Sequence, residues 1–225
     1  MKHIFALALL FSSALLAKSS GFANFNLYPY DTRDLSVYTL ELGINISSKL
    51  KYFSFTNFES QFGIDNEDIA TFYSEQNVYW AMFNNTPLHF VGQWAIAGGS
   101  QNDTLRAGAG WNISQTKFLK DFFKTIHLSY TLNWYPLQLD SLPGYRWQIE
   151  HYYYWLLFPK QLSKRMYLSG FFDHNFSDNS TITVTEHQLG INFYKQLYVV
   201  AEYRYNGFLA DKNGLGLGIE FKTSF

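Results

Sequence analysis

The chain has 225 residues, no cysteine, and 17 basic against 18 acidic side chains, which gives a formal net charge of -1. This balance disfavours a nucleic-acid polymer as a partner, because phosphate binding needs an excess of Lys and Arg, and the lack of cysteine excludes thiolate metal sites and disulfides. Aromatic residues make up 20% of the chain, yet beyond the N-terminus no apolar run reaches the roughly 18 residues of a membrane helix.

Residues 1–17 are predicted to form a cleaved secretory signal peptide, since a basic start is followed by an apolar stretch that ends at Ala17. A buried N-terminal helix or a membrane anchor is the alternative, which the two serines within the run and its short length disfavour. We expect cleavage after Ala17, with Ala23 as the other candidate position. A single domain is expected over residues 18–225, and it would work outside the cytoplasm.

The remainder alternates apolar or aromatic residues with polar ones in segments separated by short stretches of turn-forming residues. In the last segment Leu217 and Ile219 share one face, whereas Gly218 and Glu220 share the other. This period of two predicts β-strands throughout the chain. The predicted strands are 22–30, 35–46, 51–62, 71–83, 88–98, 104–113, 124–136, 144–157, 165–176, 183–194, 197–207 and 214–225.

A soluble β-sandwich also alternates in this way, so other features must separate it from a barrel in a membrane. Aromatic residues such as Trp111 and Trp134 lie near segment ends, as in the girdles of membrane barrels, and the opposite faces are polar enough for a wet lumen. The chain also ends on a strand whose last residue is Phe225, a terminal aromatic typical of bacterial outer-membrane proteins. These features predict an all-β, transmembrane antiparallel β-barrel in the outer membrane of a Gram-negative bacterium.

About twelve strands are expected, or ten if the first segment stays outside the barrel. An even number returns both ends to the periplasmic side. Connections 47–50, 84–87, 114–123, 158–164 and 195–196 would then be periplasmic. Connections 31–34, 63–70, 99–103, 137–143, 177–182 and 208–213 would be external.

Several segments resemble the nucleoside-specific Tsx-type channels and their uncharacterised relatives. The resemblance is carried by residues 144–150 (GYRWQIE) with the Tyr-rich strand that follows, by 167–173 (YLSGFFD), and by 38–41 (YTLE). The strand from Phe53 to Phe62 with Asn57 and Glu59 and the closing Gly-Leu-Gly strand occur in similar order. The resemblance implies a twelve-stranded monomeric barrel with a narrow passage; this chain is shorter than the nucleoside channels, with trimmed outer loops.

Strand parity places charged and aromatic side chains on the inferred lumen face. The acidic members are Glu41, Glu59, Glu75, Glu150, Asp173, Glu202 and Glu220, and the basic ones are Arg106, Arg146, Arg204 and Lys222. The inward aromatic residues are Phe55, Tyr79, Tyr152, Tyr154 and Phe171. A lumen that leans acidic favours neutral or cationic solutes over anions, while the alternative for each charge is structural pairing across the barrel.

The expected function is passive diffusion of small polar solutes, with nucleoside-like compounds as candidates and no cofactor or metal. The expected partners are outer-membrane lipid, a small polar solute, and the barrel-assembly machinery, which would read Phe225 as its signal. A structural or adhesive barrel is the main alternative. An outer-membrane lipid hydrolase is a weaker one, because His151 and His187 have no serine with an orienting group at a strand-compatible spacing.

Overall fold

The computed structural model describes residues 20–33, 35–61, 71–84, 86–98, 103–142, 144–178 and 180–225. The predicted signal peptide lies outside the described residues, as do most of the connections expected at 63–70 and 99–103. Ala23, the second candidate cleavage position, lies inside the first strand and pairs with Leu42 and Thr223.

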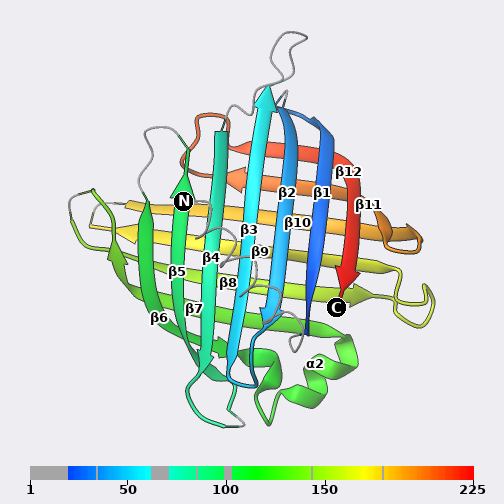
Figure 1. Cartoon of the computed structure of the whole chain (residues 1–225), viewed down its shortest axis with the longest axis horizontal. Helices are drawn as coiled ribbons and strands as arrows, with labels where there is room; N and C mark the ends of the chain where they lie inside the picture. Colours follow the sequence, from blue (N-terminus) through cyan, green and yellow to red (C-terminus); the bar gives the residue numbers. More distant parts are fainter. Residues whose placement is uncertain are drawn as a thin grey trace, which may run out of the picture.

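Twelve antiparallel strands close into a barrel in which each strand pairs with its neighbours in sequence and β1 pairs with β12 (Figure 1). The strands are β1 (Ser20–Asp31), β2 (Leu35–Asn45), β3 (Leu50–Gln61), β4 (Thr71–Ala81), β5 (Leu88–Ala97), β6 (Thr104–Asn112), β7 (Leu128–Leu139), β8 (Arg146–Leu157), β9 (Met166–Ser177), β10 (Ser180–Tyr194), β11 (Leu197–Asn206) and β12 (Asn213–Ser224). The predicted fold class and the count of about twelve strands are confirmed.

The alternation of the sequence matches the two faces of the wall. On β12 Leu217 and Ile219 are each 50% exposed on the outside, whereas Glu220 is 1% exposed inside. Among the described residues 20 polar or charged side chains are buried, against 7 hydrophobic ones. The barrel therefore has a polar interior and an apolar exterior, the reverse of a soluble domain.

One predicted strand begins too early. Residues 124–127 were expected to open the strand 124–136, but the connection from β6 to β7 holds the 3-10 helix η1 (Ile113–Gln115) and the helix α2 (Lys120–Ile126). Asp121 in the first turn of α2 and Lys124 in the last suit the helix dipole, and His127 ends the helix in a left-handed conformation (φ 57°). No helix in the described ranges is long and apolar enough to cross a membrane.

Two of the connections expected to be external are shorter than predicted. Strand β7 continues to Leu139 instead of ending at 136, with a register shift against β6 that brings one extra residue into the strand near Pro136. A bulge is where a strand tolerates proline, so the proline does not end this strand. Strand β10 already begins at Ser180, because Ser177 and Ser180 pair across a tight turn.

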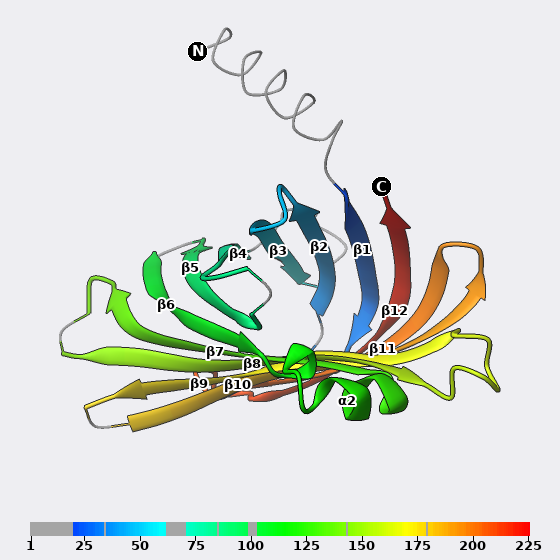
Figure 2. The same ribbon diagram turned by 90° about the horizontal axis from the view of Figure 1, so that it is seen from below.

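The barrel is flattened. Strands β3 and β9 lie six places apart in the ring of twelve and are therefore opposite each other, yet side chains from the two walls meet in the middle, as described below. Figure 2 shows β7 to β10 as a nearly flat layer with β1 to β5 arched over it. This flattening brings the side chains of opposite walls within reach of one another.

Candidate functional site

Two cavities occupy the interior, one toward each end of the barrel. The distal cavity, of about 700 Å³, reaches the connections at Arg33, Asp140 and Phe208. The terminal cavity, of about 830 Å³, reaches Gln196 and Ser224 at the end where the barrel strands begin and finish. Together the cavities extend from one rim of the barrel to the other.

The two cavities share three lining residues, Phe55, Phe171 and Glu186, which we call the neck. The Phe55 ring from β3 and the Phe171 ring from β9 stack across the lumen with centroids 6.3 Å apart. Carbon atoms in contact are about 3.5–4.0 Å apart. Rings whose centroids are 6.3 Å apart therefore leave a free gap of less than about 2.8 Å, the diameter of a water molecule. A solute that moves between the cavities must therefore pass beside the ring pair or displace it.

A hydrogen-bond network around Glu150 lies to one side of the neck. Tyr152 donates to Glu150 Oε1 at 2.5 Å, and Asn133 and Tyr135 donate to Oε2 at 3.0 and 2.9 Å. Gln93 reaches Glu150 at 3.5 Å and donates to the neighbouring carboxylate of Glu75 at 3.0 Å. Glu150 is 1% exposed and lines neither cavity, so its carboxylate is held by donors within the wall.

A second network lies on the other side of the neck, around Arg204. The guanidinium pairs with Glu202, and with Glu186 at 3.3 Å. Tyr28 donates to Glu202 at 2.6 Å and to Gln188. The neck carboxylate of Glu186 is thus linked to a buried basic group, while Glu202 is 2% exposed and lines neither cavity.

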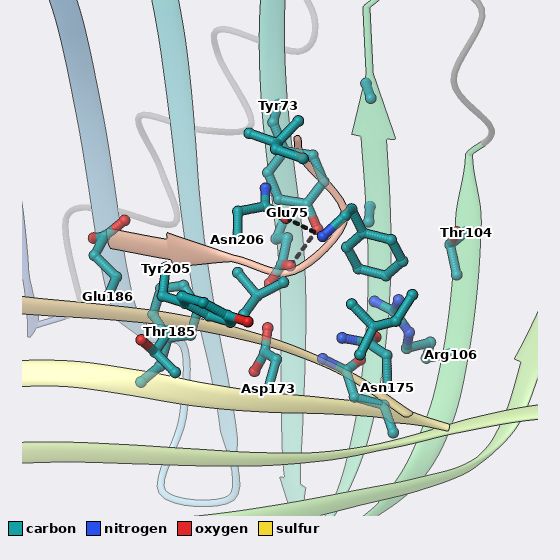
Figure 3. A pocket seen from close by; sticks show the side chains of 18 of the residues that line it. Tyr73, Glu75, Thr104, Arg106, Asp173, Asn175, Thr185, Glu186, Tyr205 and Asn206 are labelled. Atoms are coloured by element: carbon teal, nitrogen blue, oxygen red, sulfur yellow. Dashed lines mark hydrogen bonds between the residues drawn. The ribbon is translucent and has the colours of Figure 1, made fainter. Parts of the chain in front are cut away.

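Figure 3 shows the distal cavity with Glu75, Arg106 and Asp173 around it. Asp173 is only 7% exposed, and within the described part of the chain its Oδ1 has no hydrogen-bond partner. Arg106 bonds Gln93, and donates to Gln138 at 2.8 Å. Asp173 is therefore a less fully satisfied carboxylate than Glu75 or Glu150.

The rim of the distal cavity carries an ion pair between Asp140 and Arg146, at 2.8 Å. Burial alone would raise the pKa of Asp140, but a hydrogen bond from Gln138 at 2.7 Å, another from the Leu142 backbone at 2.8 Å, and the charge of Arg146 hold that pKa below its ordinary value. This carboxylate is thus ionised at neutral pH and fixes the connection between β7 and β8.

The predicted lumen residues fall into three groups. The distal cavity is lined by Phe55, Glu59, Glu75, Arg106, Arg146, Phe171, Asp173 and Arg204. The terminal cavity is lined by Glu41, Phe55, Tyr79, Tyr152, Tyr154, Phe171, Glu220 and Lys222. Glu150 and Glu202 lie within the wall networks.

Sequence reasoning missed Glu186, the neck carboxylate. Glu186 shares the even-numbered positions of its strand with Gln188 and Gly190, which the alternation places inside. This signal identifies Glu186 as inward-facing. Tyr28 and Gln93 were also missed, because neither is charged and each gains its role from partners on other strands.

The histidines considered for a hydrolase have other partners. His151 Nδ1 lies 2.8 Å from the Tyr130 hydroxyl, and His187 Nδ1 lies 2.9 Å from the Tyr153 hydroxyl. Both rings are on the outward face, and neither forms a hydrogen bond with a serine or a carboxylate among the described residues. In that same part of the chain no group of three His, Asp or Glu side chains is placed to hold a metal ion.

No family model matches the sequence, and no curated protein matches it. Among solved structures, the chain is similar to the KdgM porin, with a TM-score of 0.51, 10% identity, and coverage of 90% of this chain and 98% of that one. It is similar to the NanC porin, with a TM-score of 0.53, 9% identity, and coverage of 91% and 100%. A KdgM porin in complex with disordered oligogalacturonate gives a TM-score of 0.50 at 10% identity. What the chain shares with these outer-membrane porins is the twelve-stranded barrel fold.

Proposed function

We propose that this protein is an outer-membrane channel for the passive diffusion of small polar solutes. The observation that carries the proposal is the pair of cavities that reach opposite ends of the barrel and meet at Phe55, Phe171 and Glu186. The porin fold of the similar structures supports it. A flattened twelve-stranded barrel with a neck admits small solutes and excludes the larger ones that pass through general porins.

The charge at and beside the neck favours neutral or cationic solutes. Glu186 lines both cavities, and the partly unsatisfied Asp173 lies two residues from Phe171 on the same inward face. Arg204 offsets part of this charge, because it pairs with Glu186 and Glu202. A carboxylate at the narrowest point acts more strongly on a passing ion than one at a wide mouth, since less water lies between them.

The aromatic neck also suits solutes that carry a flat ring. Such a solute can lie against Phe55 or Phe171 as it passes, because ring faces attract one another at these separations. Nucleoside-like compounds belong to this class, in keeping with the sequence resemblance to Tsx-type channels, and are the finer part of the proposal.

Assembly in the outer membrane is proposed to depend on Phe225, the terminal residue. Its backbone bonds to Gly21 in both directions, at 2.8 and 3.0 Å, and so extends the closure of β12 onto β1. Its ring is 47% exposed and is accessible to the assembly machinery. Deletion of Phe225 should impair assembly more than Phe225→Tyr, measured as the heat-modifiable fraction in outer membranes.

We further propose that the barrel works as a monomer.

The proposal is tested in planar bilayers with a salt gradient across the membrane. Glu186→Gln should reduce the preference for cations, seen as a shift of the reversal potential toward the anion value. Glu59→Gln removes the same charge from the distal cavity away from the neck and should shift the potential less. Equal shifts in the two variants would show that the neck does not set selectivity.

A further inference from the structure

The Lys222 ammonium group lies in a cage of three tyrosine rings on the wall of the terminal cavity. Its Nζ is 3.5 Å from the centroid of the Tyr167 ring, 5.2 Å from Tyr198 and 5.6 Å from Tyr154. It also lies 3.2 Å from the carboxylate of Glu220. Aromatic faces with a nearby carboxylate are the surroundings that recognise ammonium groups, because the ring quadrupoles attract a cation.

The cage is held in shape by its own contacts. The Tyr154 and Tyr167 rings stack with centroids 5.3 Å apart, and Tyr198 meets Tyr167 edge to face at 5.7 Å. The Tyr167 hydroxyl donates to Glu220, and a side chain at Gly190 would collide with the Tyr167 ring. These rings come from β8, β9 and β11, so the cage belongs to the barrel wall and does not depend on Lys222 for its geometry.

The carboxylate of Glu220 favours a cation in the cage. Glu220 is 1% exposed, and Lys222 is the basic side chain with which it forms an ion pair among the described residues. Glu41 adds a second carboxylate to the same cavity. Removal of Lys222 without a substitute would leave an uncompensated buried charge, which is strongly unfavourable. Exchange of one ammonium group for another would leave the net charge of the cage unchanged.

Lys222 is placed so that such an exchange is possible. Its side chain is 22% exposed and lines the terminal cavity of about 830 Å³, and the lysine stem is flexible. We propose that the tyrosine cage is a binding site for the alkylammonium groups of solutes, and that Lys222 is its resident, displaceable occupant. This inference rests on the proposed channel and names one class of solute for it, organic amines.

The test is the equilibrium binding of tetramethylammonium to the full chain refolded in detergent, measured by calorimetry. Wild-type protein should bind weakly, because Lys222 competes from within. Lys222→Met should bind at least about tenfold more tightly, since the cage and Glu220 are then vacant. Lys222→Gln is a second vacant-cage variant that keeps a hydrogen-bond donor for Glu220, and Lys222→Arg keeps a cation in place and should remain as weak as wild type.

Two controls separate cage binding from general adsorption. Tyr198→Leu added to Lys222→Met should return the affinity toward that of wild type, since one wall of the cage is lost. The vacant cage should not bind tert-butanol, an uncharged molecule of similar size, more tightly than wild type does. The inference is overturned if folded Lys222→Met and Lys222→Gln bind tetramethylammonium no more tightly than wild type, or if tert-butanol shows the same gain.

Binding in detergent needs no conduction, so this test is separate from that of the channel. A protein that conducts but shows no gain on loss of Lys222 would contradict the cage alone. A barrel that seals the bilayer but shows the gain would contradict the channel alone.

Discussion

Phe171→Ala removes one of the two rings that stack across the neck, where their centroids are 6.3 Å apart. With both rings present, the gap between them is narrower than a water molecule, so loss of one ring opens a region that solvent cannot enter now. We expect single-channel conductance to rise by roughly twofold or more, because the narrowest section dominates the resistance to flow. Liposome swelling should also admit larger sugars than wild type does.

The cost in stability should be small. Loss of the ring pair removes about 0.5–1.5 kcal/mol of stabilisation beyond that of simple burial. The vacated space joins the existing cavities, so the variant has no sealed void that would destabilise it further. Phe172→Ala is the matched control: Phe172 is the next residue, faces outward, and packs on His187 with ring centroids 4.6 Å apart. Its conductance should equal that of wild type.

A double variant tests whether the two rings act as one barrier. Loss of either ring already breaks the stack. The conductance gain of the double variant Phe55→Ala with Phe171→Ala should therefore be smaller than the sum of the gains of the two single variants. Conductance of Phe171→Ala at or below the wild-type value, in protein that is folded by heat-modifiable migration, would refute the assignment of the neck.

Three further predictions concern the wall and the rim. Glu150→Gln should destabilise the barrel by about 1–3 kcal/mol, because the substituted amide cannot accept from all the buried donors that Glu150 satisfies, and should lower the urea midpoint measured by gel migration. Leu217→Arg, at a position 50% exposed on the outside, should cost about 2–4 kcal/mol in lipid, whereas Ser129→Arg enters the terminal cavity and should fold; equal damage in refolding yield would mean that the facing is wrong. Asp140→Asn should lose less than about 1 kcal/mol at neutral pH, since the pair with Arg146 is partly exposed. The depressed pKa of Asp140 means that its stabilisation is present above about pH 4 and is lost as the pH falls through the folded-state value, so melting curves of the variant and wild type should converge in acid.

The wall of the barrel could be predicted from the sequence because its rule is local. A period of two decides which residues face the same side of a strand, and it placed Leu217 outside and Glu220 inside, as the structure shows. The same rule failed at Ile126, which continues the alternation of the strand that follows but lies in helix α2. There the helix between β6 and β7 decides the conformation, and a strand pattern carries no information about it.

The contacts across the lumen could not be predicted in this way. That Phe55 meets Phe171 depends on the flattening of the whole barrel, which no single strand encodes. Alternation likewise identified Glu150 and Glu220 as inward, but it did not distinguish a carboxylate enclosed by donors from one that lines a cavity. Those differences arise from partners on strands far apart in the sequence.

A lumen that conducts and a neck that prefers cations have a direct electrical signature. That signature is the reversal potential of single channels of wild-type protein in a planar bilayer under a potassium chloride gradient. We expect discrete conductance steps and a reversal potential displaced to the cation side, and we expect Glu186→Gln to reduce this displacement. A barrel that inserts without conductance, or channels with an anion-side potential, would contradict it.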